Sequence, residues 1–362
     1  NSPDPLDLIT KYGADGLRHG IMSIAPKGQD IRFSEDRIEQ GRNFCNKLWN
    51  VSRFRTLSGS TSGNQTVTEI LSRIQPGQIK DEDAAILIRL KVTIDEVETF
   101  YQNYEFNSVL HAIYKFFWSD FCDWYVEDSK KRIKVEASKE TCLAFQDFCL
   151  REILLLLHPF TPFITEELWT LLGFSDGDSI QSIAPMSSTG FMETIAQTKI
   201  ELDPNALAEI DSVRELVTQL RALKAERNLS NNREVEFFYV SEEECSALIS
   251  KMEKSILEAV GAKSLKRIDA PKSGLPAIVS NLGSFYLDLS SGVDVEVEIL
   301  RMEKEIDNLE KNILSIEYKL NNEKFVTNAP PEVVEGARAQ LVENQLKLKE
   351  STEILHSLSS IS

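Results

Sequence analysis

Amide, cationic and aromatic side chains share one face of a helix that the sequence predicts from about Ser34 to Leu57. The face is defined by steps of four, three and four residues and comprises Asn43, Lys47, Asn50 and Phe54. Arg42 and Arg53 flank it. Such steps keep side chains on one side of a helix. Amides can recognise base edges, cations can hold phosphates and a ring can stack on an unpaired base. This face therefore predicts binding of a single-stranded RNA loop.

Phe54 leaves a second interpretation open. The other face of the same helix carries the apolar residues that we expect in the core, namely Phe44, Cys45, Leu48 and Val51, with Trp49 at the edge. A ring near the end of a helix can also pack beneath a neighbouring helix. The helical wheel alone does not decide between packing and base stacking for Phe54.

No catalytic motif accompanies this face. The sequence has no glycine-rich phosphate loop and no His-Glu-x-x-His pair. Glu166 and Glu167 are adjacent and diverge on a helix, so we interpret them as charge in the N-terminal turn that follows Pro162. His158, which precedes Pro159, is predicted to be a satisfied core or cap residue and not a metal ligand.

Composition excludes several classes of protein. The 362 residues carry a net charge of −17 and are 42% hydrophobic, which excludes a disordered chain and a general binder of nucleic acid or anionic membranes. A local exception is residues 37–55, where five cations meet one anion, Glu39. Five cysteines without a Cys-x-x-Cys pair disfavour a disulfide framework or a zinc knuckle and favour a reducing cytoplasm. The longest apolar stretch, 153–157, is too short to span a bilayer, so we expect no membrane partner.

Helical periodicity predicts a mainly α fold. Residues 34–197 show apolar residues at helical spacing and predict a helical bundle. Residues 198–292 mix helical patterns with alternating runs such as 234–240 and predict a small α+β unit. Residues 1–33 precede the bundle. They show no signal-peptide pattern and no initiating Met, which indicates a cut through a longer chain.

The last part, 293–362, is predicted to be an antiparallel coiled-coil hairpin. Apolar residues recur at steps of three and four in a first run, namely Ile299, Met302, Ile306, Leu309, Ile313, Ile316 and Leu320. A second run repeats these steps at Val334, Ala337, Leu341, Asn344, Leu348, Ser351, Leu355 and Leu358. Pro330 and Pro331 break the helix between the runs, so we expect the second run to fold back on the first. The polar seam residues, Asn344 and Ser351, are expected to fix its register.

Four stretches resemble the C-terminal half of class I aminoacyl-tRNA synthetases, specifically the valyl type. The similar strings are NSPDPL and KYGAD in residues 1–15, GQDIRF and RNFCNKLWN in 28–50, HPFTPFITEELW in 158–169, and NEKFV with APPEVV in 322–334. The third stretch is similar to a signature of the helical anticodon-binding domain in this subclass. The fourth resembles the turn of the coiled-coil arm in which valyl enzymes end.

The resemblance implies a portion that binds valine tRNA, tRNA(Val). Residues 1–33 would be a junction that contacts the tRNA stem, 34–197 the anticodon-binding bundle, and 293–362 an arm against the outer corner of the tRNA. The tRNA-contacting residues that it implies are Arg37, Arg42, Asn43, Lys47, Asn50, Arg53 and Phe54, and at the turn of the arm Lys324 and Phe325.

The resemblance also implies partners outside the sequence. In this family ATP and Mg²⁺ serve an N-terminal catalytic domain, and an inserted editing domain hydrolyses misacylated threonine. Both domains would be partners of this chain, which holds no cofactor and is expected to be inactive alone, cytoplasmic and monomeric.

Two alternatives stay open. An isoleucyl- or leucyl-type synthetase would share the bundle, although isoleucyl enzymes commonly end in a cysteine-rich zinc module that this sequence lacks. A non-catalytic scaffold that dimerises through the coiled coil would explain the arm without RNA. Residues 293–362 hold 8 basic and 14 acidic side chains, so any RNA contact of the arm is expected to be local and partly apolar.

Overall fold

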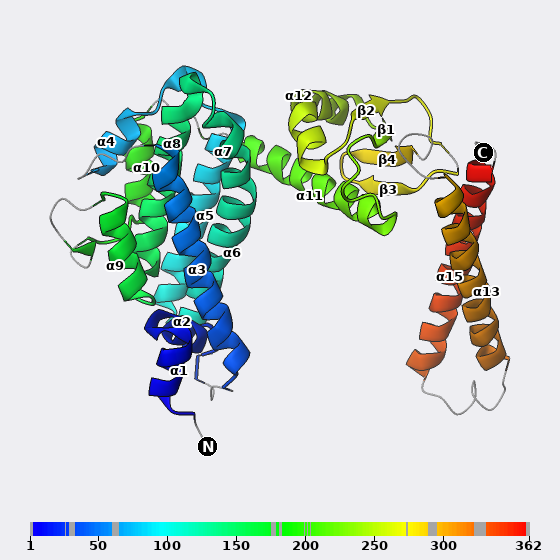
Figure 1. Ribbon diagram of the computed structural model, residues 1–362, viewed down its shortest axis with the longest axis horizontal. Coiled ribbons are helices and arrows are strands. Elements are labelled where there is room, and N and C mark those ends of the chain that lie inside the picture. Colours follow the sequence, from blue (N-terminus) through cyan, green and yellow to red (C-terminus); the bar gives the residue numbers. More distant parts are fainter. Residues whose placement is uncertain are drawn as a thin grey trace. The chain divides into compact units, whose positions relative to one another are not determined.

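The computed structural model divides the chain into two compact units, Asn1–Ile210 and Asp211–Ser362 (Figure 1). It describes residues 3–25, 27–28, 33–59, 65–174, 179–180, 183–198, 200, 202, 204–272, 274–288, 295–321 and 331–359. Helices dominate both units, as the sequence predicted, and strands occur in one small sheet of the second unit. The division falls inside helix α11 (Pro204–Glu226), whereas the predicted boundary lies after residue 197.

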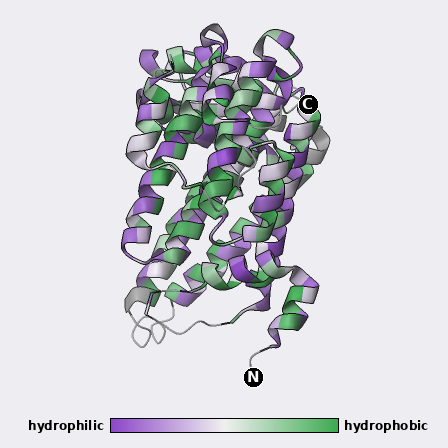
Figure 2. Ribbon diagram, turned by 90° about the vertical axis from the view of Figure 1, so that its left-hand side faces the viewer, coloured by the Kyte–Doolittle hydropathy of each residue, from purple (hydrophilic) through white to green (hydrophobic). Residues whose placement is uncertain are grey.

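The first unit is a helical bundle. Its helices before α11 are α1 (Pro5–Tyr12), α2 (Ala14–Ser23), α3 (Glu35–Ser58), α4 (Val67–Ser72), α5 (Asp81–Gln102), α6 (Phe106–Lys115), α7 (Glu127–Arg132), α8 (Glu136–Leu157), α9 (Pro162–Leu171) and α10 (Ser188–Ala196). A short 3-10 turn, η1 (Pro76–Gln78), precedes α5, and a π-helical segment, η2 (Phe116–Val126), joins α6 to α7. Figure 2 shows hydrophobic and hydrophilic residues alternating along these helices, as amphipathic helices require.

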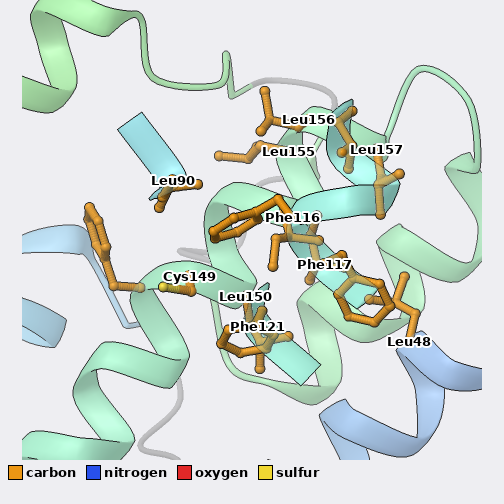
Figure 3. Close-up of a cluster of buried hydrophobic side chains, with 14 of the residues drawn as sticks. Leu48, Leu90, Phe116, Phe117, Phe121, Cys149, Leu150, Leu155, Leu156 and Leu157 are labelled. Atoms are coloured by element: carbon orange, nitrogen blue, oxygen red, sulfur yellow. The ribbon is translucent and has the colours of Figure 1, made fainter. Parts of the chain in front are cut away.

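Helix α8 forms the centre of the bundle. Almost every residue from Thr141 to Leu157 is buried, so this helix is surrounded by protein on all sides. Side chains from three other elements pack against Cys149 and Leu150 of this helix in Figure 3, namely Leu48 of α3, Leu90 of α5, and Phe116, Phe117 and Phe121 of η2. The core face predicted for α3 is confirmed for Phe44, Leu48 and Val51, while Cys45 is half-buried.

Glycines allow α2 and α3 to cross at close range. A Cβ atom added to Gly41 would lie 2.3 Å from the carbonyl oxygen of Gly16. A Cβ atom added to Gly20 would lie 2.7 Å from the Cα atom of Ile38. Both positions face backbone, which cannot move aside as a side chain can. The two backbones therefore approach closely because these positions lack side chains.

Replacing Gly41 with alanine is expected to lower the free energy of unfolding of the bundle by about 1 to 3 kcal/mol, because α2 and α3 must separate. Urea unfolding followed by tryptophan emission measures this unit alone, since all four tryptophans (Trp49, Trp118, Trp124 and Trp169) lie in it. Gly77→Ala is the control, because nothing lies within 4 Å of an added Cβ atom there. Equal midpoints for the two variants would contradict the close crossing.

Two buried carboxylates hold cations inside the bundle. Asp147 accepts a hydrogen bond from Arg55 at 2.7 Å and one from Arg73 at 2.6 Å. Asp83 accepts two from Arg132, at 2.8 and 2.6 Å, and one from the hydroxyl of Tyr125 at 2.7 Å.

Burial of Arg55 changes the interpretation of the basic stretch 37–55. Arg55 is one of the five cations of this stretch, but its side chain is 0% exposed. That charge is neutralised inside the bundle and does not reach solvent. Four cations therefore remain on the outside of α3.

The second unit contains a small α+β arrangement, as predicted. Helix α11 precedes strand β1 (Glu236–Val240), helix α12 (Glu243–Val260), and strands β2 (Ser264–Arg267), β3 (Ala277–Ser280) and β4 (Gly283–Asp288). The strand order is β2-β1-β4-β3, with β1 and β2 parallel and the other pairs antiparallel. The buried side chains of one sheet face are Phe237, Tyr239, Leu265, Phe285 and Leu287.

A buried lysine ties α11 to the end of α12. Lys224 is 1% exposed, and its ammonium donates to the carbonyl oxygens of Asn232, Val260 and Gly261 at 2.8, 3.1 and 2.6 Å. Helix α12 ends there, with Gly261 in the left-handed conformation. A cation at the negative end of a helix is favourable, and three acceptors replace the water that burial removes. Burial nevertheless lowers the pKa of Lys224.

The predicted coiled-coil hairpin is formed by α13 (Val295–Leu320) and α15 (Pro331–Ser359). Its most buried seam residues are Met302, Ile313, Ile316, Val334, Ser351 and Ile354. Ile354 was not on the predicted seam, whereas Asn344, Leu348 and Leu355 are half-buried. The predicted turn residues Lys324 and Phe325 lie outside the described residues.

Candidate nucleic-acid interface

Helix α3 presents most of its predicted polar face to solvent. Ser34 precedes the first turn, and acidic Glu35 and Asp36 in that turn suit the positive end of the helix. Further along, the predicted residues that are exposed are Arg37, Asn43, Asn50 and Arg53. Their amides and guanidinium groups are therefore accessible to a ligand.

Lys47 contacts the neighbouring segment η2. Its ammonium forms an ion pair with Asp123 at 3.2 Å and lies over the ring of Trp118, 4.9 Å from the ring centroid. The side chain of Lys47 is 32% exposed. Lys47 is thus shared between the polar face of α3 and the aromatic surface of η2.

The π-helix explains why both partners reach Lys47. Trp118 and Asp123 are five residues apart, a spacing that would turn them well away from each other on an α-helix. In a π-helix the hydrogen bonds run between residues five apart, which brings this pair onto one side. The unusual winding of η2 therefore creates the contact with Lys47.

Phe54 is half-buried and packs against the bundle core. The ammonium of Lys130 in α7 lies 5.8 Å from its ring centroid. Packing, one of the two interpretations of this ring, is therefore observed. Base stacking on Phe54 stays a prediction.

Two reciprocal cation–aromatic contacts thus run between α3 and the η2–α7 segment. Lys47 of α3 covers Trp118 of η2, and Lys130 of α7 covers Phe54 of α3. We call Lys47, Phe54, Trp118, Asp123 and Lys130 the cation–aromatic seam. Proteins that bind single-stranded nucleic acid combine cations for the phosphates with aromatic rings for the bases, and the seam contains both kinds of side chain.

Two of the predicted arginines, Arg37 and Arg42, have partners within the bundle. Arg42 forms an ion pair with Glu39 at 3.0 Å and lies over the ring of Tyr12, 5.6 Å from the centroid. Arg37 donates to the side-chain oxygen of Gln40 at 3.0 Å. Exposed contacts of this kind are weak, so these side chains can turn toward a phosphate at little cost.

An aromatic stack beside the seam was not predicted from the sequence. The rings of Tyr114 and Trp118 are stacked with centroids 5.4 Å apart, and Tyr114 is 39% exposed. Tyr114 also stacks on buried Phe44 of α3, at 5.6 Å. The available signal was the four-residue spacing of Tyr114 and Trp118 within a helical run.

The string KYGAD and Arg18, three residues after it, form hydrogen bonds with the string HPFTPFITEELW. Asp15 accepts from the backbone amide of Ile164 at 2.6 Å, at the start of α9. Arg18 donates to the carbonyl oxygens of Pro159 and Phe160, at 2.9 and 3.0 Å. Glu166 was interpreted as charge in the first turn of α9, but that turn contains no acidic residue and Asp15 supplies the negative charge instead.

Glu167 also lies beyond that first turn, which corrects the same interpretation. His158 has a hydrogen-bonded partner, as predicted: its Nδ1 lies 2.8 Å from the hydroxyl of Thr165, and burial lowers its pKa. No group of three or more His, Cys, Asp or Glu side chains that could hold a metal occurs among the residues described. In that same part of the chain, no helix is long and apolar enough to cross a membrane.

Two family models match separate parts of the chain. The model described as the anticodon-binding domain of tRNA ligase matches residues 83–239, and the valyl tRNA synthetase tRNA binding arm matches residues 294–359. The first match contains Trp118, Asp123 and Lys130 but begins after α3. The second covers the coiled-coil hairpin.

Curated relatives are similar over nearly the whole chain. A valine–tRNA ligase of Aquifex aeolicus is 32% identical over 99% of this chain and 31% of its own length. Those of Bacillus subtilis and Geobacillus kaustophilus are 33% and 35% identical over 93% of this chain and 37% of their own lengths. The chain thus spans about a third of the relatives it matches. The chain of a LeuRS–tRNA ternary complex of Agrobacterium radiobacter overlays on 75% of this chain and 30% of its own length, with 16% identity and a TM-score of 0.39.

Proposed function

This chain belongs to the valine–tRNA ligase family, and we propose that it is the part of such a ligase that recognises tRNA(Val). The observation that carries the proposal is the cation–aromatic seam, in which the exposed face of α3 meets η2 and α7. Both η2 and α7 lie within the part of the chain, residues 83–239, that matches an anticodon-binding domain. The coiled-coil hairpin supports it independently through its match to a tRNA-binding arm.

The bundle would hold the anticodon loop through side chains of different roles. Asn43 and Asn50 carry amides that can both donate to and accept from base edges. Arg53 is exposed and can pair with a phosphate, while the half-buried ring of Phe54 would stack on an unpaired base. The loop would therefore lie along α3, from Asn43 toward Phe54.

The arm would add a local contact at the outer corner of the tRNA. Its acidic balance opposes general attraction to RNA. Exposed apolar side chains are present on both of its helices, including Leu314 and Tyr318 of α13 and Val342 of α15. We infer a contact that relies on apolar surface and on a few placed charges.

Chemistry would belong to the rest of the ligase. ATP and Mg²⁺ would serve to activate valine in the catalytic domain, with the editing domain as a second partner, and this chain would position the tRNA for both. We expect the chain to work in the cytoplasm as a monomer. Sedimentation at increasing protein concentration tests the monomeric state. A scaffold that dimerises through the arm would show a higher apparent mass at higher concentration.

Replacing Phe54 with alanine is expected to weaken binding of tRNA(Val) by about 1 to 3 kcal/mol, through the loss of one stacked base. Fluorescence anisotropy of labelled tRNA at fixed salt measures the affinity. Phe163→Ala is the matched control, because Phe163 is an exposed ring of the same bundle on α9. Unchanged affinity of Phe54→Ala would contradict stacking on this ring.

The anticodon tests the valyl assignment against an isoleucyl or leucyl one. We expect tRNA(Val) to lose affinity when only its anticodon is exchanged for that of an isoleucine or leucine tRNA. A direct contact to a base is worth about 1 to 3 kcal/mol, so the difference should be measurable in the same assay. Equal binding of all three tRNAs would remove anticodon recognition from the proposal.

A further inference from the structure

The stacked rings beside the seam form a rigid aromatic surface. Trp118 stacks on Tyr114, with an angle of 15° between the rings, and Tyr114 stacks on Phe44. Phe44 is 1% exposed and also contacts buried Phe117. The stack therefore extends from the core to solvent, and its outer members are fixed before any ligand arrives.

Rigidity favours ligand binding. Two rings held in place by buried neighbours lose little freedom when a third ring joins them. Tyr114 and Trp118 lie within the region that matches an anticodon-binding domain, on the side of the bundle that faces Lys47 of α3. A base brought to α3 by the proposed function is thus within reach of these rings.

Lys47 occupies part of this aromatic surface in the free protein. Its ammonium lies over Trp118 and is held there by Asp123, whose side chain is 50% exposed. A surface cation–π contact and a surface ion pair each strengthen an equilibrium by only about 2- to 5-fold. A base stacked on an aromatic side chain contributes about 5- to 150-fold. The base is therefore the stronger occupant.

We propose that Trp118 and Tyr114 form a second stacking site for an unpaired base of the tRNA, and that the base displaces Lys47 from Trp118. The displaced ammonium then pairs with a phosphate, where releasing bound counterions adds to the affinity. Asp123 retains Lys47 over the ring until RNA binds. This inference rests on the proposed function, because the ligand is the tRNA that the bundle would hold.

Four variants test the site in the assay with labelled tRNA(Val). Trp118→Ala should weaken binding about 5- to 150-fold, whereas Trp118→Phe should retain most of the affinity because a ring remains. Asp123→Asn should strengthen binding about 2- to 5-fold by freeing Lys47, a gain that a folding defect cannot imitate. Glu136→Gln removes one exposed carboxylate elsewhere in the bundle and controls for net charge.

The outcomes separate this inference from the proposed function. The second site is supported if Trp118→Ala binds tRNA(Val) more weakly than the unchanged chain and Asp123→Asn binds it more tightly than Glu136→Gln does. Normal binding by Trp118→Ala while Phe54→Ala is weakened overturns the site and leaves the proposed function in place. An Asp123→Asn variant no tighter than Glu136→Gln overturns the displacement of Lys47. No binding of tRNA by the unchanged chain overturns both proposals.

Discussion

Replacing Asp147 with asparagine is expected to lower the free energy of unfolding of the bundle by about 3 to 5 kcal/mol. The carboxylate and the guanidinium of Arg55 are both 0% exposed, and Arg73 is the second partner of the carboxylate. Asparagine keeps the size of the side chain but removes its charge. The guanidinium of Arg55 would then be a buried cation without a counterion, which is costly in a medium of low dielectric constant.

Urea unfolding followed by tryptophan emission measures this loss. The control is Lys91→Met, which breaks the ion pair between Lys91 and Asp95, whose side chains are 31% and 39% exposed. That change is expected to cost less than about 1 kcal/mol. A double replacement, Arg55→Met with Asp147→Leu, should recover much of the stability, because it removes both charges and fills the same space. If Asp147→Asn behaved like Lys91→Met, the buried pair would not stabilise the bundle.

Spacing along the chain predicted α3 and its buried face. The apolar steps from Phe44 to Val51 fix which side of this helix is buried, because helical geometry is regular. The geometry of an α-helix does not describe η2, so the faces of this segment could not be predicted in the same way. Trp118 and Asp123 share one side only because this segment is a π-helix, and nothing in a wheel drawn for an α-helix indicates that they meet.

Charge counting along the sequence failed for a different reason. Arg55 belongs to the basic stretch by position, but its counterion Asp147 comes 92 residues later. Asp15 and Arg18 likewise meet the start of α9 across more than 140 residues. Both segments, KYGAD and HPFTPFITEELW, were identified by their resemblance to a known family. The contact between them could be seen only in the folded structure. Partners distant in sequence are set by tertiary packing, which periodicity does not describe.

Acidification from pH 7 to pH 4 is expected to lower the free energy of unfolding of the bundle by about 3 kcal/mol through His19 alone. His19 is 6% exposed and stacks on Phe44 with centroids 4.6 Å apart. Burial first, and the charge of His111 second, lower its pKa from 6.5 to about 4. At a pH between these two pKa values, His19 binds a proton in the unfolded chain but not in the folded chain. The stability that neutral His19 contributes is therefore fully present above pH 6.5 and is lost as the pH falls toward 4.

The variant His19→Leu isolates this contribution, because leucine fills a similar volume and does not titrate. Other buried groups act in the opposite direction: burial raises the pKa of Asp15 and of Glu152, so these carboxyls favour the folded state as the pH falls. The quantity to compare is therefore the difference in free energy of unfolding between wild type and His19→Leu at each pH. Urea unfolding at pH 7, 5.5 and 4.5 should show the wild type losing stability more steeply than the variant. Parallel curves would mean that His19 is not held neutral by burial, and that water reaches the ring beside Phe44.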